Sequence, residues 1–254
     1  MKKLIGTLPL LLVALFTFTS CDDGYDWPSD EDIASQLTKT DFYGKWDLED
    51  TYGYESIEFI LDDYYFIVER DDDTEEASII YGRYYISGSS KVVLSGFGTL
   101  EFSSWSGSSI RFTMTRNDGK TAIVSPTKID EISLTDDTVL ISTIWKTIST
   151  YYTDDNYGVE EYGYVAFTNT GTMIIIDSDG STQLGEWAWA QEYQSGDKEI
   201  YYKFDGDGGL SDGTQTIVKF TELSLDAATI KITFANSSEW IDVTLVAYSG
   251  SISS

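Results

Sequence analysis

From about residue 40 the chain consists of short segments in which apolar and polar residues alternate, separated by Gly, Asp, Asn and Ser. The clearest is Ser109–Thr115, in which Ile, Phe and Met share one face and polar residues occupy the other. A period of two residues predicts a half-buried β-strand. Helical periodicity is not sustained anywhere, apart from a short stretch at Asp30–Leu37. The pattern therefore predicts an all-β fold.

The first half of this region contains eight candidate strands separated by short turns. Asp118-Gly119 is a strong hairpin signal, because glycine adopts positive φ at little cost. Consecutive strands with short turns favour an antiparallel up-and-down meander, and closing the meander into a barrel removes two long exposed edges. The candidates are Tyr43–Glu49, Tyr54–Ile60, Tyr64–Glu69, Ser78–Ile86, Lys91–Leu94, Thr99–Phe102, Ser109–Thr115 and Thr121–Val124.

The second half repeats features of the first in the same order, which suggests an internal repeat. Trp46 aligns with Trp145, Gly82 with Gly185, and the strand Ile110–Met114 with Ile230–Phe234. The second copy is longer, with an insertion between Gln191 and Thr229. A chance resemblance between two β-rich halves is the alternative.

Ser125-Pro126 marks the junction of the two copies, because proline cannot donate a hydrogen bond to a β ladder. We therefore expect two antiparallel barrels of about eight strands each. Their expected limits, with the flanking segments, are a leader at residues 1–20, a tether at 21–39, barrel 1 at 40–126, a linker at 127–140, barrel 2 at 141–248 and a tail at 249–254.

The first twenty residues have the pattern of a secretory signal peptide. Met1-Lys2-Lys3 is a basic start, and the apolar run from Leu4 to Phe18 is too short to cross a bilayer comfortably. The run ends in Phe18-Thr19-Ser20-Cys21, which resembles the lipobox of bacterial lipoproteins, although Phe18 departs from the usual Leu, Val or Ile. The resemblance implies that Cys21 is lipidated. A buried free cysteine in a secreted protein is the alternative.

The stretch after Cys21 is acidic, beginning with Asp22-Asp23. It resembles the export signal of Bacteroidota-type surface lipoproteins, and also suits a solvated tether. The resemblance implies a lipid-anchored protein of the outer membrane that faces the cell exterior.

Short motifs in the body resemble the lipocalin-like (calycin-type) domains of such lipoproteins. They are Gly44-Lys45-Trp46 on the first strand, Ile57-Glu58-Phe59 on the second and Gly82-Arg83-Tyr84 on the fourth. The second copy is a looser match, because Thr143 stands where the glycine before the tryptophan is expected. The resemblance covers roughly residues 40–248 and implies tandem lipocalin-like barrels, but no defined substrate.

Composition excludes several classes of function. Sixteen Lys and Arg stand against 43 Asp and Glu, a formal charge of −27, which disfavours nucleic acid and anionic lipid surfaces as partners. Histidine is absent and cysteine occurs once, which removes the Ser-His-Asp triad, the Cys-His pair, the HExxH zinc site and any disulfide within the chain. Aromatic residues make up 15%, so a packed core is expected.

Acidic clusters fall at predicted turns, where aspartates usually bond to their own backbone. No pair is placed for glycoside hydrolysis, so we assign no catalytic residue and no cofactor. A bound calcium at Asp205, Asp207 and Asp212 is the weak alternative, since Ca²⁺ takes clustered carboxylate oxygens but these residues lack the spacing of an EF-hand.

Aromatic side chains are the better candidates for ligand binding, because exposed rings stack on sugars or line apolar pockets. Trp105 lies in a predicted polar loop, and the second copy is crowded with rings. The candidates are Trp105, Trp189, Tyr193, Tyr201 and Tyr202. Sheet packing alone explains most tyrosines of this kind.

Two functions from different classes remain. The first is a non-catalytic binding protein, anchored in the membrane through Cys21, for a small apolar molecule or a glycan. The second is a structural or interaction lipoprotein with filled barrels and no small ligand. The sequence identifies no protein partner.

Overall fold

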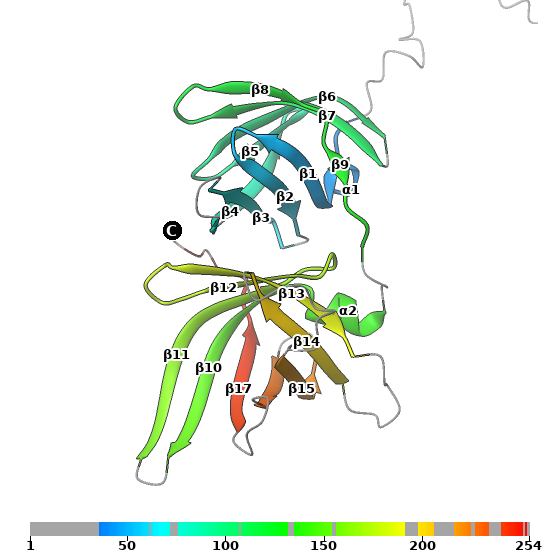
Figure 1. The fold of residues 1–254 in the computed structure, drawn as a ribbon. Coiled ribbons are helices and arrows are strands. Elements are labelled where there is room, and N and C mark those ends of the chain that lie inside the picture. Colours follow the sequence, from blue (N-terminus) through cyan, green and yellow to red (C-terminus); the bar gives the residue numbers. More distant parts are fainter. Residues whose placement is uncertain are drawn as a thin grey trace, which may run out of the picture. The chain divides into compact units, whose positions relative to one another are not determined.

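The computed structural model confirms an all-β fold with two consecutive antiparallel barrels (Figure 1). Contacts group residues 36–254 into one compact unit. The residues that the structure describes are 36–60, 62–71, 76–106, 108–131, 135–153, 156–190, 198–205, 216–224, 227–233, 240–250 and 252.

The first barrel, called barrel 1, begins with a short helix, α1 (Lys39–Phe42), and is a nine-stranded sheet. All eight strands expected in this half are present, with ends shifted by a few residues at most. The strands are β1 (Gly44–Thr51), β2 (Tyr54–Phe59), β3 (Tyr64–Arg70), β4 (Ala77–Ser87), β5 (Lys91–Leu94), β6 (Gly98–Ser106), β7 (Ser109–Arg116), β8 (Thr121–Val124) and β9 (Thr127–Lys128).

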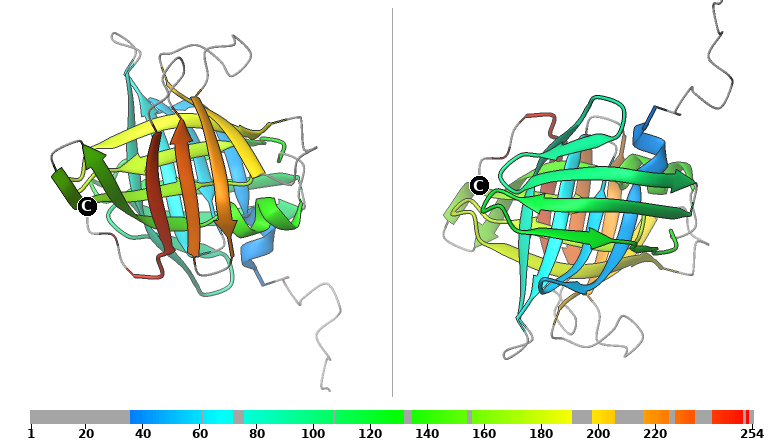
Figure 2. Two further views of the ribbon diagram at one scale, coloured as in Figure 1. Left: turned by 90° about the horizontal axis from the view of Figure 1, so that it is seen from below. Right: turned by 90° about the horizontal axis from the view of Figure 1, so that it is seen from above.

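Pro126 shapes the closure of barrel 1. It separates β8, which pairs with β7, from β9, which pairs with β1. Because proline has no N–H, it interrupts this last stretch. β8 pairs with β7, whereas β9 lies between β1 and β7 and pairs with both. β9 therefore helps to close the sheet, which differs from its expected place in the linker. Figure 2 shows how strongly both sheets curl.

The second barrel, called barrel 2, is a closed ring of eight strands in chain order. It is preceded by α2 (Asp136–Ile141), a helix that the strand-like pattern did not predict. The strands are β10 (Ile144–Thr153), β11 (Asn156–Phe167), β12 (Thr172–Ile176), β13 (Thr182–Trp189), β14 (Lys198–Phe204), β15 (Thr216–Leu223), β16 (Ala227–Thr233) and β17 (Trp240–Ala247).

Both barrels begin in the same way, with a short helix followed by a buried tryptophan. The indole N–H of Trp46 donates to the carbonyl of Phe42 at 2.7 Å, and that of Trp145 donates to the carbonyl of Ile141 at 3.0 Å. Each tryptophan thereby ties the last residue of its helix to the first strand of its barrel.

The turns β2–β3 and β11–β12 also match. Asp63 and Gly171 both have positive φ, and their carbonyls accept the backbone N–H groups of Tyr84 and Trp187, each at 2.8 Å. Tyr84 and Trp187 occupy aligned positions two residues after Gly82 and Gly185. The two barrels therefore share an indole-to-carbonyl hydrogen bond at the first aligned position and a backbone hydrogen bond near the second.

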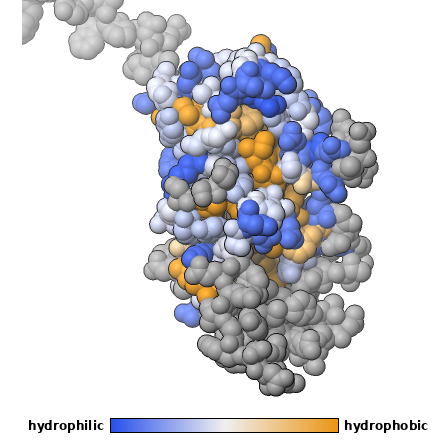
Figure 3. Space-filling model, turned by 90° about the vertical axis from the view of Figure 1, so that its left-hand side faces the viewer, coloured by the Kyte–Doolittle hydropathy of each residue, from blue (hydrophilic) through white to orange (hydrophobic). Residues whose placement is uncertain are grey.

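The exposed large hydrophobic residues of the described part of the chain are scattered over its elements. Five large hydrophobic residues are exposed, and they come from separate places along the chain: Tyr52, Tyr85, Ile123, Val139 and Val246. On the face drawn in Figure 3, apolar side chains are interspersed with hydrophilic ones. Within the described part of the chain, no helix has the length and apolar character needed to span a membrane.

Candidate functional site

The interior of barrel 1 is filled by side chains. Phe42 of α1 lies in it, with ring centroids 4.9 Å from Phe59 and 5.6 Å from Tyr84. Phe102 and Phe112 stack beside them at 5.3 Å, and all five side chains are buried. Edge-to-face rings packed in this way leave the middle of the barrel occupied by the protein itself.

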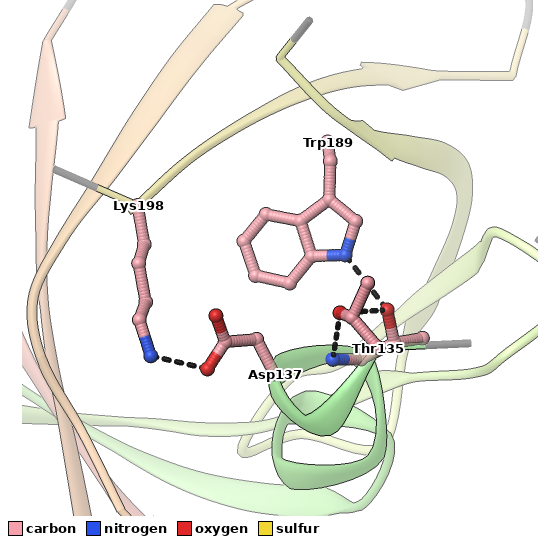
Figure 4. Close-up of polar contacts among 5 residues, drawn as sticks. Thr135, Asp137, Trp189 and Lys198 are labelled. Carbon is pink, nitrogen blue, oxygen red and sulfur yellow. Dashed lines mark hydrogen bonds and ion pairs between the residues drawn. The ribbon is translucent and has the colours of Figure 1, made fainter. Parts of the chain in front are cut away.

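One end of barrel 2 is closed by α2, and Trp189 takes part in that closure (Figure 4). The indole N–H of Trp189 donates to Thr138 Oγ1 at 2.9 Å. Thr138 is buried, and its backbone N–H donates at 3.2 Å to Thr135 Oγ1, the cap of the helix. Asp137 of the same helix forms an ion pair with Lys198 of β14. These contacts hold α2 against the wall of the barrel.

Trp189 also contacts other rings that point into barrel 2. Its centroid lies 5.6 Å from that of Trp187 and 6.1 Å from that of Phe220. Among the ligand-binding candidates, Trp189 is thus engaged in packing and in holding a helix.

The remaining aromatic candidates do not meet at one place. Trp105 lies on β6 and packs against the core of barrel 1, so its predicted position in a polar loop is wrong. The strand continues through Ser103 and Ser104, which were predicted to lie in a loop. Tyr202 packs on Phe204 at 5.5 Å, and Tyr201, its neighbour on β14, is half-buried. Tyr193 lies outside the described residues.

Of the three aspartates proposed as a weak calcium site, the structure describes only Asp205, and Asp205 pairs with an arginine. Asp205 Oδ2 accepts a hydrogen bond from Arg70 at 2.9 Å, whereas Asp207 and Asp212 lie outside the described residues. No group of three potential ligands occurs among the residues that can be described. Cys21 also lies outside them.

The two barrels meet through the outer faces of β3 and β4 in barrel 1 and of β10, β11 and β12 in barrel 2. An apolar cluster joins Ile60, Tyr64, Phe66, Ile79 and Tyr81 of barrel 1 to residues of barrel 2. Their partners in that cluster are Ile144, Ala166, Ile174 and Ile176. This cluster buries the outer face of strands whose inner face is already covered by the barrel interior.

Residues 248–250 and 252 add to the contact between the barrels. The hydroxyl of Tyr64 donates to the carbonyl of Gly250, and the guanidinium of Arg83 donates to the same carbonyl and to that of Ser249. Tyr248 stacks on Tyr164 with centroids 4.6 Å apart. The segment after β17 is therefore held by side chains of β3 and β4.

A buried carboxylate lies at the polar edge of this interface. Glu58 and Lys45 are directly opposite each other on β2 and β1, and Glu58 is only 2% exposed. Glu58 Oε1 accepts a hydrogen bond from Thr170 of barrel 2 at 2.6 Å, whereas Oε2 has no partner among the described residues. Burial raises the pKa of Glu58, and Lys45 and the nearby threonine hydroxyls lower it in part.

Beside this pair lies a cleft of about 360 Å³ between the barrels, which we call the inter-barrel cleft. Barrel 1 contributes charged side chains from β1, β2 and β3, and barrel 2 contributes residues of β12, β13 and β14. The charged residues that line it are Lys45, Glu55, Arg70, Glu186, Lys203 and Asp205.

One row across barrel 2 forms a wall of the cleft. Thr172 pairs with Glu186, and Glu186 pairs with Lys203, so the three side chains stand side by side on adjacent strands. From barrel 1, Lys45 Nζ donates to Thr172 Oγ1 at 3.1 Å. Arg70 bridges the barrels, with Nε 2.7 Å from Glu55 Oε2 and a second nitrogen on Asp205.

The sequence did not single out the residues of this cleft. Only Asp205 was a candidate, and for a different ligand. Lys45, Arg70 and Lys203 are isolated cations on strands of an acidic chain, and Glu58 stands between two apolar residues. These features signal polar groups on the outer face, but the outer face becomes a cleft only because another barrel covers it.

The comparisons with known proteins identify no family. No family model and no curated protein matches the chain. Among solved structures, the chain is similar to HpuA from Kingella denitrificans, crystallised in complex with human haemoglobin. The identity is 11%, the match covers 84% of this chain and 90% of that chain, and the TM-score is 0.26.

Proposed function

We propose that this protein is a lipid-anchored, cell-surface, non-catalytic binding protein, and that it binds through surfaces outside its two barrels. Cys21 holds the anchor, residues 21–39 form the tether, and the two packed barrels present the binding surface.

The filled interior of barrel 1 is the observation that carries this proposal. A carrier of small apolar molecules needs an enclosed apolar cavity. In barrel 1 that space holds Phe42, Phe59, Tyr84, Phe102 and Phe112. In barrel 2, α2 closes one end and the rings of Trp187, Trp189 and Phe220 pack together inside. Of the two ligand classes left open by the sequence, the geometry favours the glycan.

A structural or interaction lipoprotein without a small ligand is the second candidate. The apolar cluster between the barrels favours it, because two barrels packed together with filled interiors also suit a spacer or a docking platform. The fluorescence titration described next distinguishes both of these functions from that of a carrier of apolar molecules.

The test is tryptophan fluorescence of the whole mature protein carrying Cys21→Ser, titrated with fatty acids and bile acids and, separately, with polysaccharides. Trp187 and Trp189 report on the interior of barrel 2, so an apolar ligand that entered it would change their emission. We expect a flat response to the apolar panel. Saturable binding of a fatty acid or bile acid would overturn the proposal.

The anchor is tested separately by fractionating cells that express the wild type or the Cys21→Ser variant. The wild type is expected in the outer-membrane fraction and accessible to added protease on whole cells. A variant that stays in that fraction to the same extent would contradict lipidation at Cys21.

A further inference from the structure

We infer that the inter-barrel cleft binds a short, uncharged saccharide. This inference rests on the proposed function and adds the place of binding and the chemical class of the ligand.

The size of the cleft sets the first limit. A volume of about 360 Å³ is at the lower end of the range for small-molecule sites, which suits one or two sugar rings rather than a long chain held along its length. A longer glycan would place a terminal unit in the cleft and leave the rest in solvent.

The charges of the lining exclude other ligand classes. An apolar molecule would have to desolvate six charged side chains without replacing their hydrogen bonds, which is costly. An anion would meet Glu55, Glu186 and Asp205 in a chain of net charge −27. A cation would meet the positive charges of Lys45, Arg70 and Lys203.

A neutral polyol satisfies such a lining, because each hydroxyl both donates and accepts a hydrogen bond. Ammonium and guanidinium groups supply donors, and carboxylates supply acceptors, on adjacent positions of the same walls. The row Thr172, Glu186 and Lys203 offers a hydroxyl, a carboxylate and an ammonium group on three adjacent strands. Leu184 and Phe204 add apolar surface for the C–H face of a sugar ring.

The walls are also ordered before a ligand arrives. Arg70 is held by carboxylates from both barrels, and Lys45 is held by Thr172. Side chains already fixed in place lose little conformational entropy on binding, so a small ligand gains affinity from few contacts.

The test uses the whole mature protein with Cys21→Ser and a panel of uncharged di- and trisaccharides of glucose, xylose, mannose and galactose. Binding is measured by isothermal titration calorimetry and by saturation-transfer NMR. Glu186→Ala removes an exposed carboxylate of the cleft, and Glu101→Ala removes an exposed carboxylate of β6 that does not line it. The two variants change the net charge equally.

We expect at least one saccharide to bind saturably, with a dissociation constant raised at least tenfold by Glu186→Ala and unchanged by Glu101→Ala. Glu186→Gln, which keeps the shape of the side chain, repeats the test if the alanine variant does not fold. Equal affinity in wild type and both Glu186 variants would overturn the cleft as the site.

A trigalacturonate or spermidine control that binds in the cleft, when no neutral saccharide does, would overturn the uncharged class. No response to any member of the panel would overturn the inference as a whole. None of these results decides the proposed function, which is tested separately by apolar ligands inside the barrels and by the fractionation of the Cys21→Ser variant.

Discussion

Trp46→Phe tests whether the indole hydrogen bond at the start of barrel 1 stabilises the fold. Trp46 is fully buried, and its indole N–H is 2.7 Å from the carbonyl of Phe42. α1 has only four residues, so it depends on such tertiary contacts to persist. Phenylalanine keeps an aromatic ring at this position but removes the donor.

The expected loss has two parts. Removing the donor leaves the buried carbonyl of Phe42 without its hydrogen bond, which costs about 2 kcal/mol. The space left by the smaller ring costs about another 1 kcal/mol. The free energy of unfolding should therefore fall by about 3 kcal/mol, and Trp145→Phe should act similarly in barrel 2, where the matching bond is 3.0 Å long.

Urea unfolding followed by circular dichroism measures this change. Trp105→Phe is the matched control, because that ring is only partly buried and packs at the edge of the core, and it should cost less than about 1 kcal/mol. If Trp46→Phe also cost less than about 1 kcal/mol, the indole bond would not be what fixes α1, and the reasoning would be refuted.

Three further predictions concern pH, packing and metal. Folding raises the pKa of Glu58, so the stability that its protonated carboxyl contributes is complete below the pKa of the unfolded chain and is lost as pH rises through the folded pKa. The melting temperature of Glu58→Gln relative to that of wild type should therefore increase with pH. A difference between the two melting temperatures that is constant from pH 4 to pH 8 would contradict this. Gly185→Ala should lower the free energy of unfolding by about 1–3 kcal/mol in urea, since a Cβ there would lie 2.7 Å from the carbonyl oxygen of Lys203, and an unchanged midpoint would show that the strands yield freely. Excess EDTA should leave the melting temperature in a thermal scan within a couple of degrees, whereas a large drop would indicate a structural calcium.

The strands could be predicted because each depends on local pattern. Alternation with a period of two marks which residues face the interior, and the turn at Asp118-Gly119 is specified by its own residues; Gly119 has the expected positive φ. Even the break at Pro126 follows from the missing N–H. Local signals of this kind do not predict which strand the residues after Pro126 pair with. β9 was therefore expected to be part of the linker, although it pairs with β1.

The cleft could not be predicted, because its walls come from strands far apart in the chain. One signal of the interface was present nonetheless. Tyr64–Val68 and Met173–Ile176 are almost entirely apolar, where a strand with one solvated face should alternate. Both segments are largely buried in the structure, and their outward residues Phe66 and Ile174 lie in the cluster between the barrels. A continuous apolar run in an antiparallel barrel therefore indicates that its outer face is covered.

The contact of Arg83 with Ser249 joins residues 166 positions apart in the chain, and the hydrogen bond from the amide of Ile252 to the hydroxyl of Tyr64 spans 188 positions. Contacts between such distant residues form late, because the entropy of closing a long loop must be overcome first. This part of the cover over β3 and β4 comes from residues that follow the last strand of barrel 2, so it is expected to form late in folding. During refolding, protection of the Ile252 amide proton from hydrogen exchange is therefore expected to appear late, when the two barrels have packed together.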